Sequence, residues 1–307
     1  MSDPVEGFRD WGARLSNWGR WGAGDGRGTL NWITPERVAA AARLIQVGEV
    51  VSLGLPLDAD GPQPSDGVRP NPVHVMTRTP DVEPEPGGFQ WMDDMLTMAP
   101  QSATQLDALS HVAYDGFLYN GVPVDSIGPG GASVHGVEAL REGVHGRGLL
   151  VDLPRHLGVD RLSADHAVTV EELDDCLARQ GLEPSQGDTL LVRTGWLRTL
   201  RDQGRSAYMS REPGLSLPVT AWLSEHRIAF VASDNWGLEI APSQSPESMP
   251  VHCVLVRDMG MAIGEMFDLE GLADACSRHQ RWEFFFSAHP LQITGGTGSP
   301  LEPKAIF

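Results

Sequence analysis

Apolar and polar residues follow two periods along this chain, one typical of strands and one typical of helices. Short apolar or alternating runs of strand length occur at 50–55, 73–77, 148–153, 190–195, 228–234 and 282–286. Helices are predicted over 34–45, 137–141, 168–180, 218–225 and 269–275. Strands and helices that alternate in this way predict an α/β domain.

Two of the predicted helices carry clear start signals. Thr34 is a suitable N-cap, and Pro35 follows at the first helical position. Thr169 is followed by acidic residues that the helix dipole favours in a first turn. A further apolar run over 252–257 is interpreted as a strand with His252 at its head.

The remaining segments are rich in turn residues. Residues 1–35 combine tryptophans with many glycines, so we expect an irregular arm whose indoles pin it to the body. Proline-rich stretches at 58–72 and 80–88 are predicted to be loops. We find no repeat and no linker, so the chain is interpreted as a single domain, 1–307, that includes the N-terminal arm.

Composition restricts the possible partners. The 307 residues carry a formal net charge of −18, which argues against nucleic acid or an anionic membrane surface as a partner. The chain has three widely spaced cysteines, no apolar leader in its first residues and no run of about 18 apolar residues. We therefore expect a cytoplasmic protein with reduced thiols that acts on a small molecule.

The densest group of polar side chains lies in the segment 101–111, QSATQLDALSH. If this segment is a strand, Gln101, Gln105, Asp107 and His111 project from one face. If a helix begins near Asp107, that carboxylate and His111 still share a face. A polar strand edge followed by a capped helix is the simpler structural explanation, but buried polar groups cost free energy unless they are partnered.

Several familiar kinds of site are absent from the sequence. There is no Gly-x-Ser-x-Gly motif, no cysteine in a catalytic context and no dinucleotide fingerprint. What remains is a set of carboxylates and imidazoles: Asp107, His111, His252 and Glu265, with Gln101 and Gln105 nearby. Such groups suit a divalent ion that activates water, with a histidine as proton shuttle.

Structural explanations compete with each of these roles. His252 is also explained as a core histidine at the start of a strand, and Glu265 as a carboxylate at a helix start. His74 lies in an alternating run, where a lone histidine is commonly structural. These alternatives stay open at the level of sequence.

The segment 101–111 resembles a signature, His-x-Gly-Thr-His-x-Asp-x-x-x-His, of the cyclase family, which includes bacterial kynurenine formamidases and isatin hydrolases. The resemblance extends over most of the chain and includes these segments: 21–31, 34–36, 71–74, 187–188, 193–196, 250–252, 260–265 and 295–300. It implies a swivelling β/β/α-type α/β fold, with a mixed β-sheet or barrel-like core flanked by helices, and a homodimer or homotetramer.

The resemblance also implies roles for individual residues. Asp107, His252 and Glu265 are implied as metal ligands and His111 as proton donor and acceptor. Gln101 and Gln105 stand where the formamidases have metal-binding histidines. Because an amide oxygen suits harder ions, we expect the first metal position to be weakened, with Gln105 as a further ligand. One divalent ion (Zn, Mn or Mg), none, or two remain alternatives.

Three functions follow from these residues. The first is hydrolysis of a C–N or C–O bond in a cyclic or aromatic amide, formamide or lactone by water that a metal or His111 activates. The second is metal-independent cyclisation, dehydration or isomerisation by His111 and Asp107, and the third is non-catalytic binding. Oxyanion donors are expected from Thr104 or the 295–298 backbone. Substrate contacts are expected from these residues: His74, Gln101, Thr104, Gln105, Trp21, Tyr119 and Trp236.

Overall fold

The computed structural model describes residues 7–65 and 67–307, so the expectation about the first six residues of the N-terminal arm lies outside the described residues. Within this part of the chain, nine strands form one curved mixed sheet in the order β1-β15-β13-β7-β9-β11-β12-β4-β14. Their bounds are β1 Val50–Ser52, β4 Gln105–Asp107, β7 Val144–Asp152, β9 Thr189–Arg193, β11 Phe230–Ser233, β12 Ile263–Glu265, β13 Glu283–Ala288, β14 Gly298–Pro300 and β15 Lys304–Ile306.

The four central strands β7, β9, β11 and β12 run parallel to one another, and every other pairing in this sheet is antiparallel. The α-helices are α1 Phe8–Leu15, α2 Pro35–Ala41, α3 Leu153–Leu157, α4 Val170–Gln180, α5 Leu197–Gln203, α6 Arg205–Ser210, α7 Val219–Glu225, α8 Pro250–His252 and α9 Glu270–His279. The predicted α/β class and the mixed, barrel-like sheet flanked by helices are confirmed.

Short elements complete the fold. The helical turns are η1 Gly28–Trp32, η2 Ala42–Leu44, η3 Tyr119–Gly121, η4 Val124–Ser126, η5 Val137–Leu140 and the π-helix η6 Cys253–Asp258. Minor strand pairs are formed by β5 Ile127–Gly128 with β6 Gly131–Ala132 and by β8 Ala167–Val168 with β10 Gly214–Leu215. Both predicted helix starts are confirmed, because the hydroxyls of Thr34 and Thr169 accept backbone N–H bonds from Arg37 and Glu172.

Successive residues of the central strands point into two separate cores, as the alternation of a strand requires. Leu149 and Val151 of β7 enter the core that α4 and α7 cover. Leu150 enters the opposite core, which α9 and the N-terminal elements cover. Both faces of the parallel strands are therefore buried, which explains why these strands appear in the sequence as continuous apolar runs.

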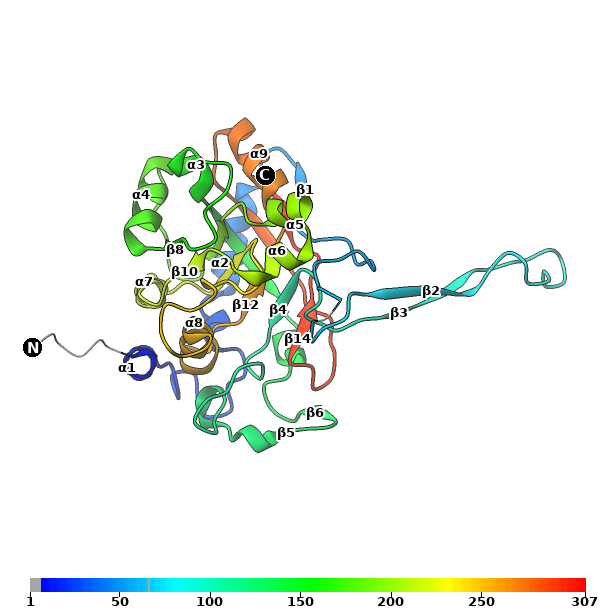
Figure 1. Cartoon of the computed structure of the whole chain (residues 1–307), viewed down its shortest axis with the longest axis horizontal. Helices are drawn as coiled ribbons and strands as arrows, with labels where there is room; N and C mark the ends of the chain where they lie inside the picture. Colours follow the sequence, from blue (N-terminus) through cyan, green and yellow to red (C-terminus); the bar gives the residue numbers. More distant parts are fainter. Residues whose placement is uncertain (1–6, 66) are drawn as a thin grey trace, which may run out of the picture.

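A hairpin of strands β2 (Val73–Arg78) and β3 (Asp93–Thr97) leaves the body as a long arm (Figure 1). Strand 73–77 was predicted, but its partner β3 was not, because its residues Asp93 and Asp94 give it no apolar alternation. All residues of β3 are exposed. We call the segment 73–97 the arm.

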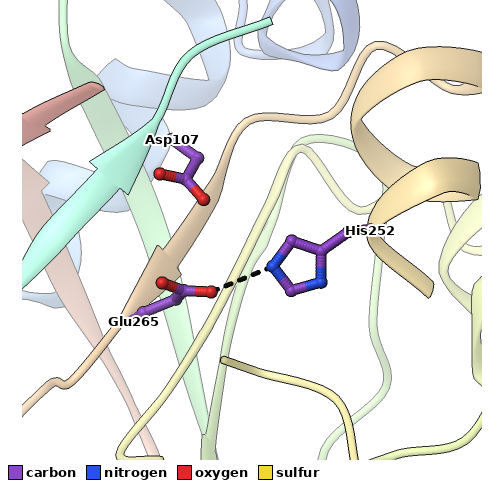
Figure 2. Close-up of side chains that lie close together, drawn as sticks. All are labelled: Asp107, His252 and Glu265. Carbon is purple, nitrogen blue, oxygen red and sulfur yellow. Dashed lines mark hydrogen bonds and ion pairs between the residues drawn. The ribbon is translucent and has the colours of Figure 1, made fainter. Parts of the chain in front are cut away.

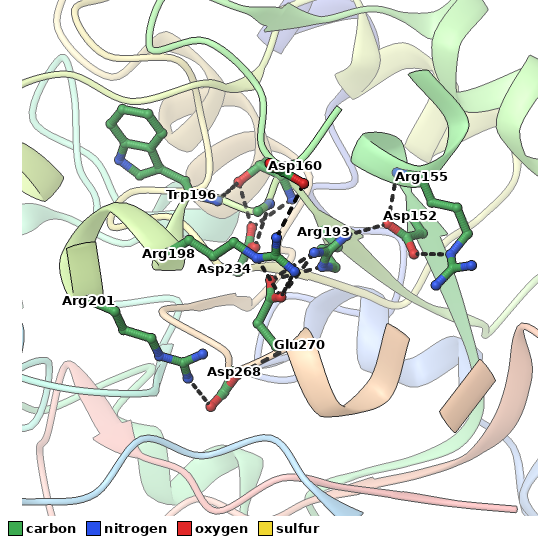
Figure 3. A network of polar contacts seen from close by, with 12 residues as sticks. Asp152, Arg155, Asp160, Arg193, Trp196, Arg198, Arg201, Asp234, Asp268 and Glu270 are labelled. Carbon is green, nitrogen blue, oxygen red and sulfur yellow. Dashed lines mark hydrogen bonds and ion pairs between the residues drawn. The ribbon is translucent and has the colours of Figure 1, made fainter. Parts of the chain in front are cut away.

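The carboxyl ends of β7, β9 and β11 meet in a buried ionic network (Figure 3). Arg193, the last residue of β9, donates to Asp152 at the end of β7 over 2.6 Å and to both carboxylate oxygens of Glu270 over 3.0 Å. Asp234, just after β11, accepts from the Thr194 and Gly195 N–H groups. The carboxyl ends of parallel strands are where α/β proteins often bind ligands, and at β7, β9 and β11 that end is closed by ion pairs.

All three cysteines are buried and unpaired. Over the residues that the structure describes, no helix combines the length and the apolar character needed to cross a membrane.

Replacing Arg193 with methionine is expected to lower the free energy of unfolding by about 3–5 kcal/mol, because it leaves the carboxylates of Asp152 and Glu270 buried without their cation. Arg201→Met is the matched control: Arg201 pairs with Asp268 at the surface, and its loss should cost less than about 1 kcal/mol. Urea unfolding at neutral pH measures both. Equal losses in the two variants would contradict this role of the network.

The pH dependence of the network has a defined sign. Burial alone raises the pKa of Glu270, but its bonds from Arg193 and Arg198 outweigh burial and hold that pKa below its ordinary value. A lowered pKa contributes stability above the pKa of the unfolded chain, and the contribution is lost as pH falls through the folded pKa. The Arg193→Met deficit should therefore shrink when urea unfolding is repeated at acidic pH.

Candidate active site

Strand β4 brings the polar segment 101–111 into the sheet as its second strand from one edge, between β12 and the edge strand β14. It pairs antiparallel with β12 on one side, where Gln105 faces Glu265, and with β14 on the other, where Asp107 faces Gly298. All three residues of β4 are buried. The register thus joins the two polar segments that the sequence separates by about 160 residues.

Asp107, His252 and Glu265 converge at this point (Figure 2). One ligand-type atom from each lies within 4.8 Å of the others, and all three residues are buried. The Nε2 atom of His252 lies 3.0 Å from Oε1 of Glu265. The amide of Gln105 donates to the other carboxylate oxygen, Oε2. Three of the four predicted metal ligands are therefore brought together in space, and the fourth, Gln105, contacts Glu265.

His252 is placed by helical structure, so the prediction of a strand at 252–257 is wrong. Helix α8 ends at His252, and the π-helix η6 follows directly. A run of apolar residues does not distinguish a buried helix from a buried strand. π-Helical turns are rare and are frequent at functional sites. Glu265 lies at the end of β12 and not at a helix start.

Glu239 holds His252 from the other side, and nothing in the sequence pattern points to it. Its carboxylate accepts from Nδ1 of His252 over 2.6 Å and from the Val251 and His252 N–H groups. A carboxylate behind a histidine fixes the ring orientation and raises its basicity, as it does in metal sites. Burial alone would lower the pKa of His252, but its bonds to Glu239 and Glu265 raise it well above the ordinary value.

The N-terminal arm fixes η6 and the turn after it. Trp18 donates its indole N–H to the carbonyl of Arg257, and the amide of Asn17 donates to Met259. Gly28, with a positive φ of 54°, lies so close to the carbonyl of Gly260 that a Cβ atom would clash with it. The expectation that indoles pin this arm to the body is confirmed for Trp18. The N-terminal arm therefore supports both His252 and the strand that carries Glu265.

His111 lies at the wall of a cavity of about 520 Å³. Its Nε2 atom is 3.7 Å from Oδ2 of Asp107, and its Nδ1 atom is 3.4 Å from the amide of Gln101. The side chain is 25% exposed, whereas that of Asp107 is buried. Burial raises the pKa of Asp107 to about 6; the charge of Glu265 acts in the same direction and that of His111 opposes it. An imidazole with a buried carboxylate behind it and a cavity before it can transfer protons.

The cavity has further walls that the segment 101–111 does not supply. Its lining includes Trp236, one of the aromatic residues expected at the site, and Arg69, which the sequence does not single out. Arg69 lies in the loop before β2, and a basic residue in a loop carries no periodic signal. The other lining residues are Val112, Ala113, Ser248, Met249 and Cys253, together with Asp107, His111, His252 and Glu265.

Four residues that were expected to contact the substrate do not line this cavity. His74 is on the arm, half exposed and paired with Asp94. Trp21 packs edge-on against Trp32, and the buried hydroxyl of Tyr119 bonds to Asp25. Thr104 donates to the Met266 carbonyl and accepts from Leu55 N–H, which leaves no proton for an oxyanion. In the 295–298 loop, the N–H groups of Gly295 and Gly296 are bonded to Glu138 and Ile293.

Two buried acceptor atoms of the site have no hydrogen-bond partner within the part of the chain that the structure describes: Oδ1 of Asp107 and Oε1 of Gln105. Buried acceptors are rarely left unpaired, and a cation satisfies such atoms. Two carboxylates, one imidazole and one amide oxygen form a mixed donor set that suits zinc, manganese or magnesium. The residues present therefore fit one divalent ion, which is one of the alternatives that the sequence leaves open.

Solved structures resemble this chain over nearly its whole length. A protein described as a novel cyclase is 40% identical, with a TM-score of 0.90 over 96% of this chain and 99% of that one. Isatin hydrolase A from Labrenzia aggregata, solved with benzyl benzoate, is 20% identical, with a TM-score of 0.63 over 86% of this chain and 94% of that one. Isatin hydrolase A from Ralstonia solanacearum is 22% identical, with a TM-score of 0.62 over 88% and 95%. The isatin hydrolases show a shared fold.

No curated protein matches the chain. The family model described as "Putative cyclase" matches residues 51–240, which is more than half of the chain and includes β4, β7, β9 and β11. With the 40% identical relative, this match confirms the resemblance that the segment 101–111 indicated. The chain belongs to the cyclase family.

Proposed function

We propose that this protein hydrolyses a C–N or C–O bond in a cyclic or aromatic amide, formamide or lactone. The observation that carries the proposal is the placement of His111, which faces the cavity beside the buried cluster of Asp107, His252 and Glu265. Proton transfer by a positioned imidazole and charge at the reacting carbonyl are what hydrolysis of such bonds needs.

Asp107, His252 and Glu265 would hold a divalent ion, with the free amide oxygen of Gln105 beside them. When bound, such an ion lowers the pKa of a water molecule toward neutrality and polarises a carbonyl oxygen. Glu239 supports this role, because it takes the Nδ1 side of His252 and leaves Nε2 directed at the cluster.

His111 performs the proton transfers in this proposal. As a neutral base it takes a proton from the attacking water, and as an acid it returns that proton to the leaving nitrogen or oxygen. Asp107 stabilises the imidazolium between the two steps, and the amide of Gln101 contacts Nδ1. The apolar and aromatic walls of the cavity, Val112, Ala113 and Trp236, suit a cyclic or aromatic substrate.

One observation favours a second function, metal-independent acid/base chemistry such as cyclisation, dehydration or isomerisation. Both carboxylate oxygens of Glu265 already accept bonds from within the chain, one from Gln105 and one from His252. In that arrangement the chain's own donors neutralise Glu265, and His111 with Asp107 forms the acid/base pair. Metal dependence of the reaction separates the two functions.

His111→Ala is expected to lower kcat by at least about 10²-fold without a loss of stability, because the proton shuttle is removed from a partly exposed position. His166→Ala is the matched control, since His166 also pairs with a carboxylate, that of Glu172, and is also 25% exposed, but lies in a different part of the fold. The measurement is steady-state turnover of aryl formamides, lactams and lactones. Retained turnover in His111→Ala would reject His111 as the residue that transfers the proton.

The purified protein is expected to hold about one equivalent of divalent metal, and removal of the metal by a chelator should abolish hydrolysis. Glu239→Gln should weaken metal binding by about 10–100-fold, because it removes the carboxylate that orients His252. Glu225→Gln, at an exposed position on α7 away from the cluster, is the control. Elemental analysis and titration with zinc or manganese provide the readout. Full, His111-dependent hydrolysis in metal-free protein would show that His111 and not an ion activates the water, whereas metal-free cyclisation, dehydration or isomerisation would support the second function.

A further inference from the structure

Arg69 is unusual among the residues that line the cavity. Among the described lining residues it alone carries a permanent positive charge. Its described contacts are one N–H bond to the carbonyl of Gln101 over 3.3 Å and a position over the ring of Trp236, 5.6 Å from the centroid. No described carboxylate lies within ion-pair distance of its guanidinium, although the chain carries 41 acidic residues.

The charged groups around the guanidinium of Arg69 are mostly carboxylates. Asp107 and Glu265 line the same cavity, and Glu239 lies just behind His252. An anionic ligand would be repelled from these carboxylates unless a cation held it. Arg69 is placed to do so.

We propose that Arg69 binds a carboxylate of the substrate while Trp236 supports the guanidinium from one side. A guanidinium presents its N–H groups as a planar fork that matches the two oxygens of a carboxylate. The bond to Gln101 and the indole fix that fork at the cavity wall, which reduces the ordering needed on binding. The substrate class is thus narrowed to aromatic or cyclic amides and lactones that carry a carboxylate. This inference rests on the proposed function.

Binding of benzoate tests the proposal without turnover, with neutral benzamide as its isostere. Calorimetry should show that wild-type protein prefers benzoate and that Arg69→Gln weakens benzoate binding by about tenfold or more, because charge-assisted hydrogen bonds are lost. Benzamide binding should not change. Arg69→Lys should restore only part of the affinity, because lysine keeps the charge without the fork. Arg43→Gln, at an exposed position outside the cavity, is the control.

Equal benzoate affinity in wild type and Arg69→Gln, or no preference of the wild type for benzoate over benzamide, would overturn the proposal. Unchanged thermal unfolding of Arg69→Gln shows that a loss of binding is local. The proposed function fails separately, because benzoate binding does not require hydrolysis. Arg69-dependent benzoate binding with no turnover of any amide or lactone would support the carboxylate site and reject the hydrolase.

Discussion

The pairing of β4 with β12 is the constraint on which the rest of the site depends. It sets Gln105 opposite Glu265 and Asp107 opposite Ile263, so that side chains of like orientation from both strands meet on one side. Because side chains alternate along a strand, a shift of one residue would turn Asp107 into the apolar core and Leu106 into the polar cluster. Leu106 is completely buried in that core, and its burial therefore helps to fix the register.

His252, the third residue of the cluster, lies on a helix and not on a strand of the sheet. His252 reaches the strands because α8 continues into a π-helix, and the N-terminal arm holds that helix through Asn17 and Trp18. The close approach of Gly28 to Gly260 leaves no space for a side chain at Gly28, so the N-terminal arm packs directly against the turn before β12. Segments from both ends of the chain thus position one imidazole.

Much of the fold could be predicted from sequence, because buried parallel strands and capped helices leave regular patterns. The runs 148–153, 190–195 and 228–234 became β7, β9 and β11, and Thr169 does begin α4. The run 252–257 could not be assigned, since an apolar run fits a buried helix as well as a strand. Strand β3 is carried on an exposed arm, where no buried face imposes an alternation.

The candidate site likewise contains residues that could be predicted from the sequence and residues that could not. Residues of one short segment, Asp107 and His111, could be identified because they lie close together in sequence. Glu239 and Arg69 could not, because their roles arise only from contacts across the fold with His252 and with the cavity.

Charge connects these parts of the site. Asp107, Glu239 and Glu265 surround the single imidazole of His252, and a nearby buried carboxyl, Glu212, has its pKa raised well above the ordinary value by burial. Carboxylates that face one another in a low-dielectric interior stay ionised only when cations or N–H donors compensate them. Without a bound ion, protonated His252 supplies one positive charge between two carboxylates. A bound cation would replace that proton, because a ligating imidazole is neutral, and would also contact the unpartnered oxygens of Asp107 and Gln105. Arg69 adds a positive charge at the cavity wall, near the same carboxylates. Burying several carboxylates in this cluster costs free energy. The same carboxylates can bind a cation at one side of the cluster and orient His111 at the other.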